Sequence, residues 1–191
     1  MTKKEAKLFV FAAPSGSGKT TIVKDVLKNY SEFVFSISAT TRKKRQSETD
    51  GKDYYFITES DFLNKIGNNE FVEWERFYDY YYGTLKSQIV SNIENGLHTV
   101  FEVDVKGAVK IKECYPSSIL IFIAPPSIEV LRNRLIQRNT ETEEDLKKRI
   151  ERAEMELSYK DKFDYVVSNV DLEIAKEDVR RIIENAIKEN K

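Results

Sequence analysis

The stretch APSGSGKTT, residues 13–21, decides the fold because of what stands on each side of it. Before it, Leu8–Ala12 is a short apolar run that predicts a buried strand. After it, Lys19–Asn29 has the apolar spacing of an amphipathic helix. A strand, a glycine loop and a helix in this order are typical of the first unit of an α/β fold.

Within this stretch, Gly18, Lys19 and Thr20 match the end of the phosphate-loop pattern G-x-x-x-x-G-K-[ST]. Ala13 replaces the first glycine of the pattern, but Gly16 and Gly18 still let backbone N–H groups curl round an oxyanion. Lys19 would reach the β- and γ-phosphates, and the Thr20 hydroxyl would ligate Mg²⁺. The loop therefore predicts binding of ATP or GTP by Ala13, Pro14, Ser15, Gly16, Ser17, Gly18, Lys19, Thr20 and Thr21.

Beyond the loop, short apolar runs alternate with amphipathic stretches, which predicts a mainly parallel sheet with helices on both faces. We expect Ser127, Thr142 and Asp171 to cap three of the helices. Only Phe33–Phe77 breaks the alternation, and it predicts a small, largely β lobe with one short helix. The further expected strands are His98–Val103, Ser118–Ala124 and Tyr165–Ser168, and the expected helices are Ser60–Lys65, Leu85–Asn95, Val105–Glu113, Ser127–Gln137, Thr142–Tyr159 and Asp171–Asn190.

The composition favours one soluble, cytoplasmic domain with a local anion site. The 191 residues carry 31 basic and 32 acidic side chains, a net charge of −1, which argues against a nucleic-acid binder held by a basic surface. One cysteine, Cys114, and one histidine, His98, argue against an internal disulfide and a zinc site. The apolar run after the N-terminal lysines is too short for a signal peptide, and no run approaches the ~20 residues of a membrane span.

A second anion site is expected around TTRKKRQSETDGKDYYF, residues 40–56. Arginine forks and phenolic hydroxyls suit one isolated phosphate, and acidic residues follow the basic run at once. A nucleic-acid groove would instead spread its basic residues over a surface. The residues expected to hold this phosphate are Arg42, Arg45, Tyr54 and Tyr82.

These features together resemble the guanylate kinases over essentially the whole chain. The motifs that carry the resemblance are PSGSGKT (14–20), SISATTRKKRQSETDGKDYYF (36–56), FVEW (71–74), YYGT (81–84), EVDVKGA (102–108), RNTETEE (138–144) and VVSNVDL (166–172). The resemblance implies transfer of a phosphoryl group from MgATP to GMP, giving ADP and GDP in purine nucleotide metabolism. It implies no nucleic-acid, membrane or obligate protein partner.

The resemblance also assigns the acceptor site. Glu73 and Asp104 would accept from the N1–H and N2–H₂ donors of guanine, and Ser38 and Thr84 would offer hydroxyls to O6. Adenine presents the opposite pattern, which leaves the carboxylates without donors. The complete set of expected GMP-binding residues is Ser38, Arg42, Arg45, Glu48, Tyr54, Glu73, Tyr82, Thr84 and Asp104.

For catalysis, the resemblance implies positioning and charge neutralisation without a strong general base. Arg134, Arg138 and Asn169 would bind ATP, and Asp104 would hold a Mg²⁺-bound water. The expected catalytic residues are Lys19, Arg45, Arg138 and Arg149. Within one domain, 1–191, we expect a core at about 1–35, 96–126 and 160–191, a GMP-binding lobe at about 36–90 and a lid at about 134–155.

Four positions depart from the family pattern, namely Ala13, Tyr80, Lys106 and Val170, and Lys106 could pair with Asp104. The charged run Lys147–Glu156 is more simply a solvated helix face. Three alternatives stay open: a guanylate-kinase-like module that binds proteins without catalysis, a kinase for another nucleoside monophosphate, and a nucleic-acid binder based on residues 42–45. The retained phosphate loop argues against the first of these.

Overall fold

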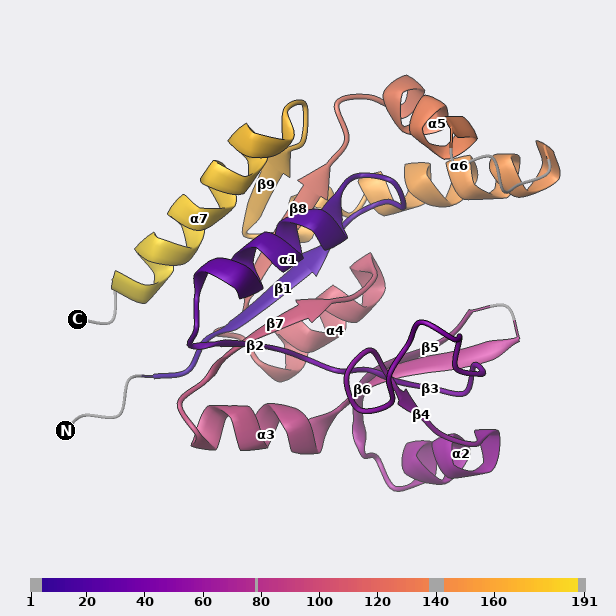
Figure 1. Ribbon diagram of the computed structural model, residues 1–191, viewed down its shortest axis with the longest axis vertical. Coiled ribbons are helices and arrows are strands. Elements are labelled where there is room, and N and C mark those ends of the chain that lie inside the picture. The colour runs from indigo at the N-terminus through magenta and orange to yellow at the C-terminus, as the bar shows by residue number, and fades with distance from the viewer. Residues whose placement is uncertain (1–4, 78, 138–142, 189–191) are drawn as a thin grey trace.

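The computed structural model describes residues 5–77, 79–137 and 143–188. Its centre is a five-stranded parallel sheet in the order β2-β7-β1-β8-β9 (Figure 1). This arrangement confirms the predicted α/β class with a mainly parallel sheet. The strands are β1 (Leu8–Ala12), β2 (Phe33–Phe35), β7 (His98–Glu102), β8 (Ile119–Ala124) and β9 (Tyr165–Ser168).

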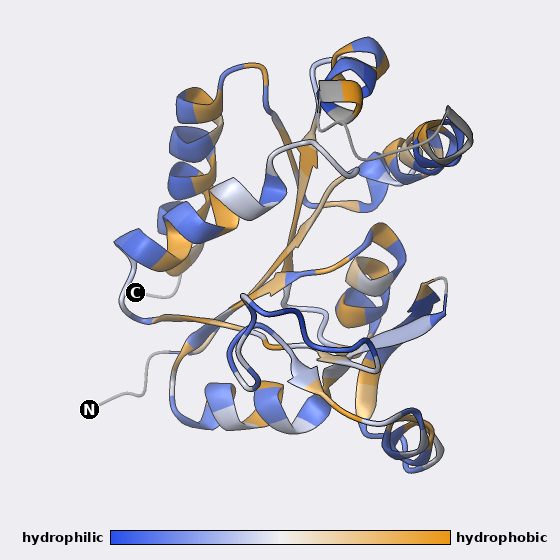
Figure 2. Cartoon of the chain, turned by 45° about the vertical axis from the view of Figure 1, so that its right-hand side comes forward, coloured by the Kyte–Doolittle hydropathy of each residue, from blue (hydrophilic) through white to orange (hydrophobic). Residues whose placement is uncertain are grey.

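Helices cover both faces of this sheet because its inner strands are apolar on both sides. Alternate residues of β1 point to opposite faces: Phe9 and Phe11 pack with helices α1 (Lys19–Asn29) and α7 (Leu172–Lys188). Leu8, Val10 and Ala12 pack instead with α4 (Val105–Cys114) and with Ile89 of α3 (Lys86–Glu94). Figure 2 shows these strands as the hydrophobic centre of the molecule. No helix in the described ranges is long and apolar enough to span a membrane.

Strand β2 belongs to this central sheet. The pattern of Phe33–Phe77 had placed it in the β lobe, whereas the expected core at about 1–35 includes it. Phe33 pairs with His98 in parallel register, and its ring lies 5.2 Å from that of Phe9 and 4.9 Å from that of His98. Burial of Phe33 against these rings outweighs the continuity of FVFSIS with the lobe. His98 is buried, and its Nδ1 accepts a hydrogen bond from the Lys7 backbone N–H at 2.9 Å, so this histidine has a structural role.

A second sheet, in the order β4-β3-β6-β5, lies within residues 39–85 (Figure 1). The helix α2 packs against it through Phe62, whose ring stacks on Phe71 at 4.4 Å and on Tyr81 at 5.3 Å. Its own small core makes this sheet a separate packing unit beside the central one. The elements are β3 (Ala39–Thr40), β4 (Tyr55–Phe56), α2 (Glu59–Gly67), β5 (Phe71–Phe77) and β6 (Tyr80–Leu85).

The remaining elements are α5 (Ile128–Gln137), α6 (Glu143–Leu157) and a short 3₁₀ helix, η1 (Lys160–Lys162). The Ser127 hydroxyl accepts from the Val130 N–H at 3.1 Å, and the Asp171 carboxylate accepts from two amides of α7 at 2.8 and 3.1 Å. Both predicted caps are therefore confirmed, and Thr142 lies outside the described residues. Helices α5 and α6 and the second sheet all lie toward the carboxyl ends of the central strands (Figure 1).

Candidate active site

The glycine loop between β1 and α1 has the backbone that anion binding requires. Gly16 and Gly18 have φ angles of 92° and 90°, in the left-handed region that other residues avoid. The turn is closed by a hydrogen bond from the Ser17 N–H to the Pro14 carbonyl at 3.1 Å. Gly18 is the N-cap of α1, so the unpaired N–H groups of the first helical turn face the loop.

Lys19 and Thr20 both lie against Glu102 at the end of the neighbouring strand β7. The Lys19 Nζ donates to the Val103 carbonyl at 2.9 Å and lies 4.0 Å from a Glu102 carboxylate oxygen. Burial lowers the pKa of Lys19, and the Glu102 carboxylate opposes this effect. The Thr20 hydroxyl donates to the same carboxylate. Sequence reasoning missed Glu102, although its place at the carboxyl end of a strand beside the loop was a usable signal.

Two side chains from outside the loop, those of Asn169 and Arg134, contact backbone carbonyl groups of the loop. The buried Asn169 Nδ2 donates to the Ser17 carbonyl at 2.7 Å. The guanidinium of Arg134 lies 3.5 Å from the Gly16 carbonyl oxygen and 3.4 Å from that of Asn169. The structure therefore brings both predicted ATP-binding side chains to the loop, while Arg138 lies outside the described residues.

Replacing Gly18 by alanine is expected to lower the free energy of unfolding by about 2–4 kcal/mol. A Cβ atom at this position would lie 2.3 Å from the Asn169 Nδ2, and φ would stay at 90°. The variant would lose the hydrogen bond from Asn169 to the Ser17 carbonyl, and alanine would be strained in the left-handed backbone conformation of Gly18. Urea unfolding measures the change, and Gly67→Ala is the control because its Cβ would meet open space. Equal stabilities of the two variants would contradict the expectation.

Arg42, which follows strand β3, is fixed beside two tyrosines. Its guanidinium donates to both Glu48 carboxylate oxygens, at 2.6 and 3.0 Å, and lies 5.4 Å from the ring centre of Tyr54. The Tyr54 and Tyr82 rings meet edge to face at 6.0 Å. Arg42 and the Arg45 backbone N–H, which lies 2.8 Å from Glu48, lower the pKa of Glu48 to about 2. Glu48 therefore organises the expected phosphate site by holding Arg42 and the Arg45 backbone in place.

Glu73 lies on β5 and pairs with Thr84 of β6, two residues along that strand from Tyr82. Its carboxylate accepts from the Thr84 hydroxyl at 2.5 Å, and burial raises its pKa to about 7. A Cβ at Gly107 would lie 3.0 Å from the Glu73 Oε2, so the carboxylate rests on the first turn of α4. Asp104 caps that turn by accepting from the Gly107 N–H at 2.7 Å. Ser38 lies between β2 and β3, and its carbonyl accepts from the Tyr55 N–H at 2.9 Å.

The helix α6 supplies a further cation that sequence reasoning missed. Arg152 lies 3.0 Å from Glu156, 3.4 Å from Glu75 and 3.6 Å from Asp104. Only 5% of Glu156 is exposed, so the prediction that Lys147–Glu156 is a solvated face is wrong for its C-terminal part. The predicted catalytic residue Arg149 is half-buried, three residues before Arg152 on the same helix.

Three of the departures from the family pattern lie on the surface. Val170 is 71% exposed and Tyr80 is 40% exposed. Lys106 is also exposed, and the cation that the structure places beside Asp104 is Arg152. Ala13 is buried at the exit of β1, where the chain enters the loop without needing a glycine.

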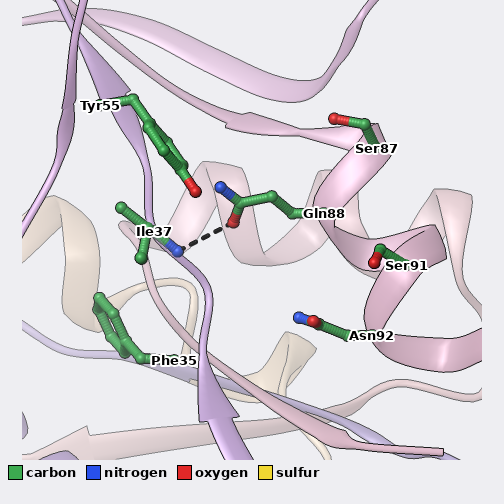
Figure 3. A pocket seen from close by; sticks show the side chains of 7 residues that line it. All are labelled: Phe35, Ile37, Tyr55, Ser87, Gln88, Ser91 and Asn92. Atoms are coloured by element: carbon green, nitrogen blue, oxygen red, sulfur yellow. Dashed lines mark hydrogen bonds between the residues drawn. The ribbon is translucent and has the colours of Figure 1, made fainter. Parts of the chain in front are cut away.

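A pocket of about 310 Å³ lies between α3 and the chain that follows β2 (Figure 3). The Gln88 side chain crosses it and accepts from the Ile37 N–H at 3.1 Å. No predicted substrate-binding residue is among those that form its wall. The lining residues are Phe35, Ile37, Tyr55, Ser87, Gln88, Ser91 and Asn92.

Comparison with known proteins agrees with this arrangement. A family model described as guanylate kinase matches residues 5–186. A guanylate kinase of Thermotoga maritima is 48% identical over 179 residues, which are 94% of this chain and 86% of that protein. One from Caldanaerobacter subterraneus is 46% identical over 181 residues, 95% of this chain and 88% of that protein. The crystal structure of a guanylate kinase from Anaplasma phagocytophilum superposes with a TM-score of 0.74 at 29% identity, covering 96% of this chain and 87% of that one. The chain belongs to the guanylate kinase family.

Proposed function

We propose that this protein transfers the γ-phosphoryl group of ATP to GMP, and to dGMP, and releases ADP and GDP in the purine nucleotide metabolism of the cytoplasm. The observation that carries the proposal is the segment 102–107, which serves two sites at once. Its first residue, Glu102, contacts Lys19 and Thr20 of the phosphate loop. Its last, Gly107, lies against the Glu73 carboxylate. A donor nucleotide on the loop and an acceptor base on Glu73 would therefore be held by one rigid piece of chain.

The acceptor side suits guanine because its buried groups are hydrogen-bond acceptors. Guanine offers N1–H and N2–H₂ side by side, and Glu73 and Asp104 offer carboxylate oxygens to meet them. In the free protein the Thr84 hydroxyl donates to Glu73, and it can turn toward O6 when guanine takes its place. The phosphate of GMP is assigned to Arg42, Arg45, Tyr54 and Tyr82, with Glu48 holding Arg42. Ser38 is assigned, with Thr84, to O6 of guanine.

Binding of GMP is expected to strengthen as the pH rises toward about 7 and to level off above it. The pKa of Glu73 is raised to about 7 by burial and by Asp104, against Thr84 and Lys110, so at pH 6 the free protein holds mostly the neutral acid. Only the ionised acid accepts two hydrogen bonds from guanine, so a proton must leave before GMP binds.

Isothermal titration of GMP between pH 5.5 and 8.5 measures this effect. The phosphate of GMP also titrates in this range, so Glu73→Gln is the control, which keeps the phosphate contribution and removes that of Glu73. Identical pH profiles of the two proteins would contradict the assignment of the carboxylate.

Catalysis is proposed to rest on positioning, because the attacking oxygen of GMP is already anionic and needs no strong base. Lys19 would hold the β- and γ-phosphates in line with that oxygen. Arg45, Arg138 and Arg149 would neutralise the charge that spreads over the transferred group. Arg134 and Asn169 would fix the loop and the ATP bound to it, and closure of the segment at about 134–155 would keep water out.

Mg²⁺ fits the residues beside the loop. The Thr20 hydroxyl and the Glu102 carboxylate are hard oxygen donors already in contact with each other, and Mg²⁺ is commonly held by one or two such groups together with substrate phosphates. When bound, the ion would draw negative charge from the β- and γ-phosphate oxygens. Among the described residues, no group of three or more acidic, histidine or cysteine side chains could hold a metal. A role of Asp104 through a metal-bound water stays a prediction.

The test is ADP release from ATP and Mg²⁺ with GMP, dGMP, AMP, UMP and CMP offered separately. We expect turnover with GMP and dGMP, at most a trace with the other three, and no turnover when EDTA replaces Mg²⁺. Equal rates with all bases would contradict the recognition roles. A folded protein that turns over none of them would instead favour a protein-binding module that has lost catalysis.

A further inference from the structure

The base-binding face of the second sheet continues beyond Glu73 along β5. Side chains two residues apart on a strand share a face, so Glu73, Glu75 and Phe77 point the same way. Their partners across the antiparallel pair with β6 are Thr84, Tyr82 and Tyr80, respectively. This face therefore carries both the residues proposed to bind guanine and, on the same strand, Glu75, which the proposed function does not use.

Helix α6 contacts this face of β5 at Glu75 and Phe77. The guanidinium of Arg152, from α6, lies 4.5 Å above the Phe77 ring centre and 3.4 Å from the Glu75 carboxylate. It also lies 3.6 Å from Asp104, the N-cap of α4, and 3.0 Å from Glu156 of its own helix. The Arg152 side chain thus contacts α6, β5 and the start of α4. Arg152 and Glu75 are 77 residues apart in the sequence.

The surroundings favour a forked cation at this position. Glu75, Asp104 and Glu156 bring three carboxyl groups together, and their side chains are 38%, 20% and 7% exposed. Burying such a cluster without a cation is unfavourable, and the planar guanidinium can address several oxygens while its face covers Phe77. The ammonium of a lysine would not reproduce this geometry.

We infer that Arg152 is a positioning residue that ties α6 to the GMP-binding face, bridging Glu75 and Asp104 so that the helix and the second sheet move together. Asp104 is one of the two carboxylates assigned to guanine, so one of the two groups that Arg152 bridges would also bind the base of GMP. The functional part of this inference rests on the proposed function, because it makes the position of α6 depend on an occupied GMP site. The structural part, the bridge itself, does not.

The structural part is tested by hydrogen exchange of the backbone amides of β5 in the nucleotide-free protein. Arg152→Ala and Glu75→Ala are each expected to speed exchange there by roughly three- to tenfold, and the double variant is expected to be no faster than the faster single variant. Glu75→Gln, which keeps an oxygen for Arg152, is expected to stay near wild type. Lys147→Ala is the control for loss of a basic side chain from the exposed part of α6. Effects that multiply in the double variant, or no effect of either change, would overturn the bridge.

The functional part is tested by steady-state kinetics of the same variants. We expect the KM for GMP to rise by a similar factor in Arg152→Ala, Glu75→Ala and the double variant, with kcat within about threefold of wild type. A kcat that falls at least a hundredfold in Arg152→Ala and not in Glu75→Ala would overturn the positioning role and make Arg152 a phosphate contact. If the wild-type protein does not phosphorylate GMP, the proposed function fails, while the exchange experiment still decides whether the bridge exists.

Discussion

GMP is expected to be phosphorylated with a kcat/KM about 10⁴- to 10⁵-fold above that of AMP, and Glu73→Gln is expected to reduce this ratio to about 10² or less. The reason is the pattern of donors and acceptors at a buried position. The Glu73 carboxylate offers only acceptors when ionised, and adenine brings an acceptor, N1, where guanine brings N1–H. A glutamine amide brings a donor to this position, so it opposes guanine and matches adenine.

The measurement is kcat/KM for both acceptors in wild type and variant, with circular dichroism to show that the variant is folded. Glu70→Gln is the matched control, because Glu70 is a carboxylate on the same lobe that pairs with Lys65 at 2.8 Å on the surface. Its ratio is expected to stay within twofold of wild type. A Glu73→Gln protein that keeps the full preference for GMP would remove Glu73 from base recognition.

Replacing Arg45 by alanine is expected to lower kcat by on the order of 10³-fold or more, the size of effect seen when a transition-state arginine is lost. Arg45 is exposed in the free protein, and its position comes from its backbone, since its N–H donates to Glu48 at 2.8 Å. Its guanidinium is therefore available for the phosphoryl group, whereas that of Arg42 is already bound to Glu48.

The neighbouring Lys44→Ala is the control, because this exposed lysine belongs to the same basic run and has no assigned role. Its kcat is expected to stay near that of wild type. Arg42→Ala is expected to act mainly on the KM for GMP, since this residue is assigned to the bound phosphate. A fall in kcat of less than tenfold in Arg45→Ala would show that the transferred group is neutralised elsewhere.

Local patterns predicted the elements of this protein well because each one is encoded by neighbours in sequence. The strand Leu8–Ala12 and the loop after it were found from apolar runs and glycine spacing, and Ser127 and Asp171 from the chemistry of helix caps. Only the pattern of Phe33–Phe77 placed β2 in the lobe, whereas the core expected at about 1–35 includes it; its pairing with β7 depends on Phe33 meeting Phe9 and His98. A contact of this kind has no signature in the strand itself.

The site was predicted unevenly for the same reason. The loop residues and Arg42 stand in recognisable motifs, and the position of Glu102 at the end of a strand was a signal that was not used. Arg152, in contrast, acquires its surroundings only through folding. Arg152 lies in a charged run that has the composition of a solvated helix face, and only the approach of β5 shows that part of this face is covered. Charge patterns predict exposure on an isolated helix, but they do not reveal what packs against it.

The segment 102–107 has a consequence for redesign of this protein. Glu102 contacts the phosphate loop, and Asp104 and Gly107 lie beside the proposed acceptor site. Under the proposed function, a substitution of one of these three residues is therefore expected to change the affinity for both nucleotides. Attempts to make the enzyme accept a different base should therefore leave these three positions alone. Thr84 and Ser38 are better starting points, because both are assigned to the base and their hydrogen bonds in the described residues run to Glu73 and Tyr55 of the lobe.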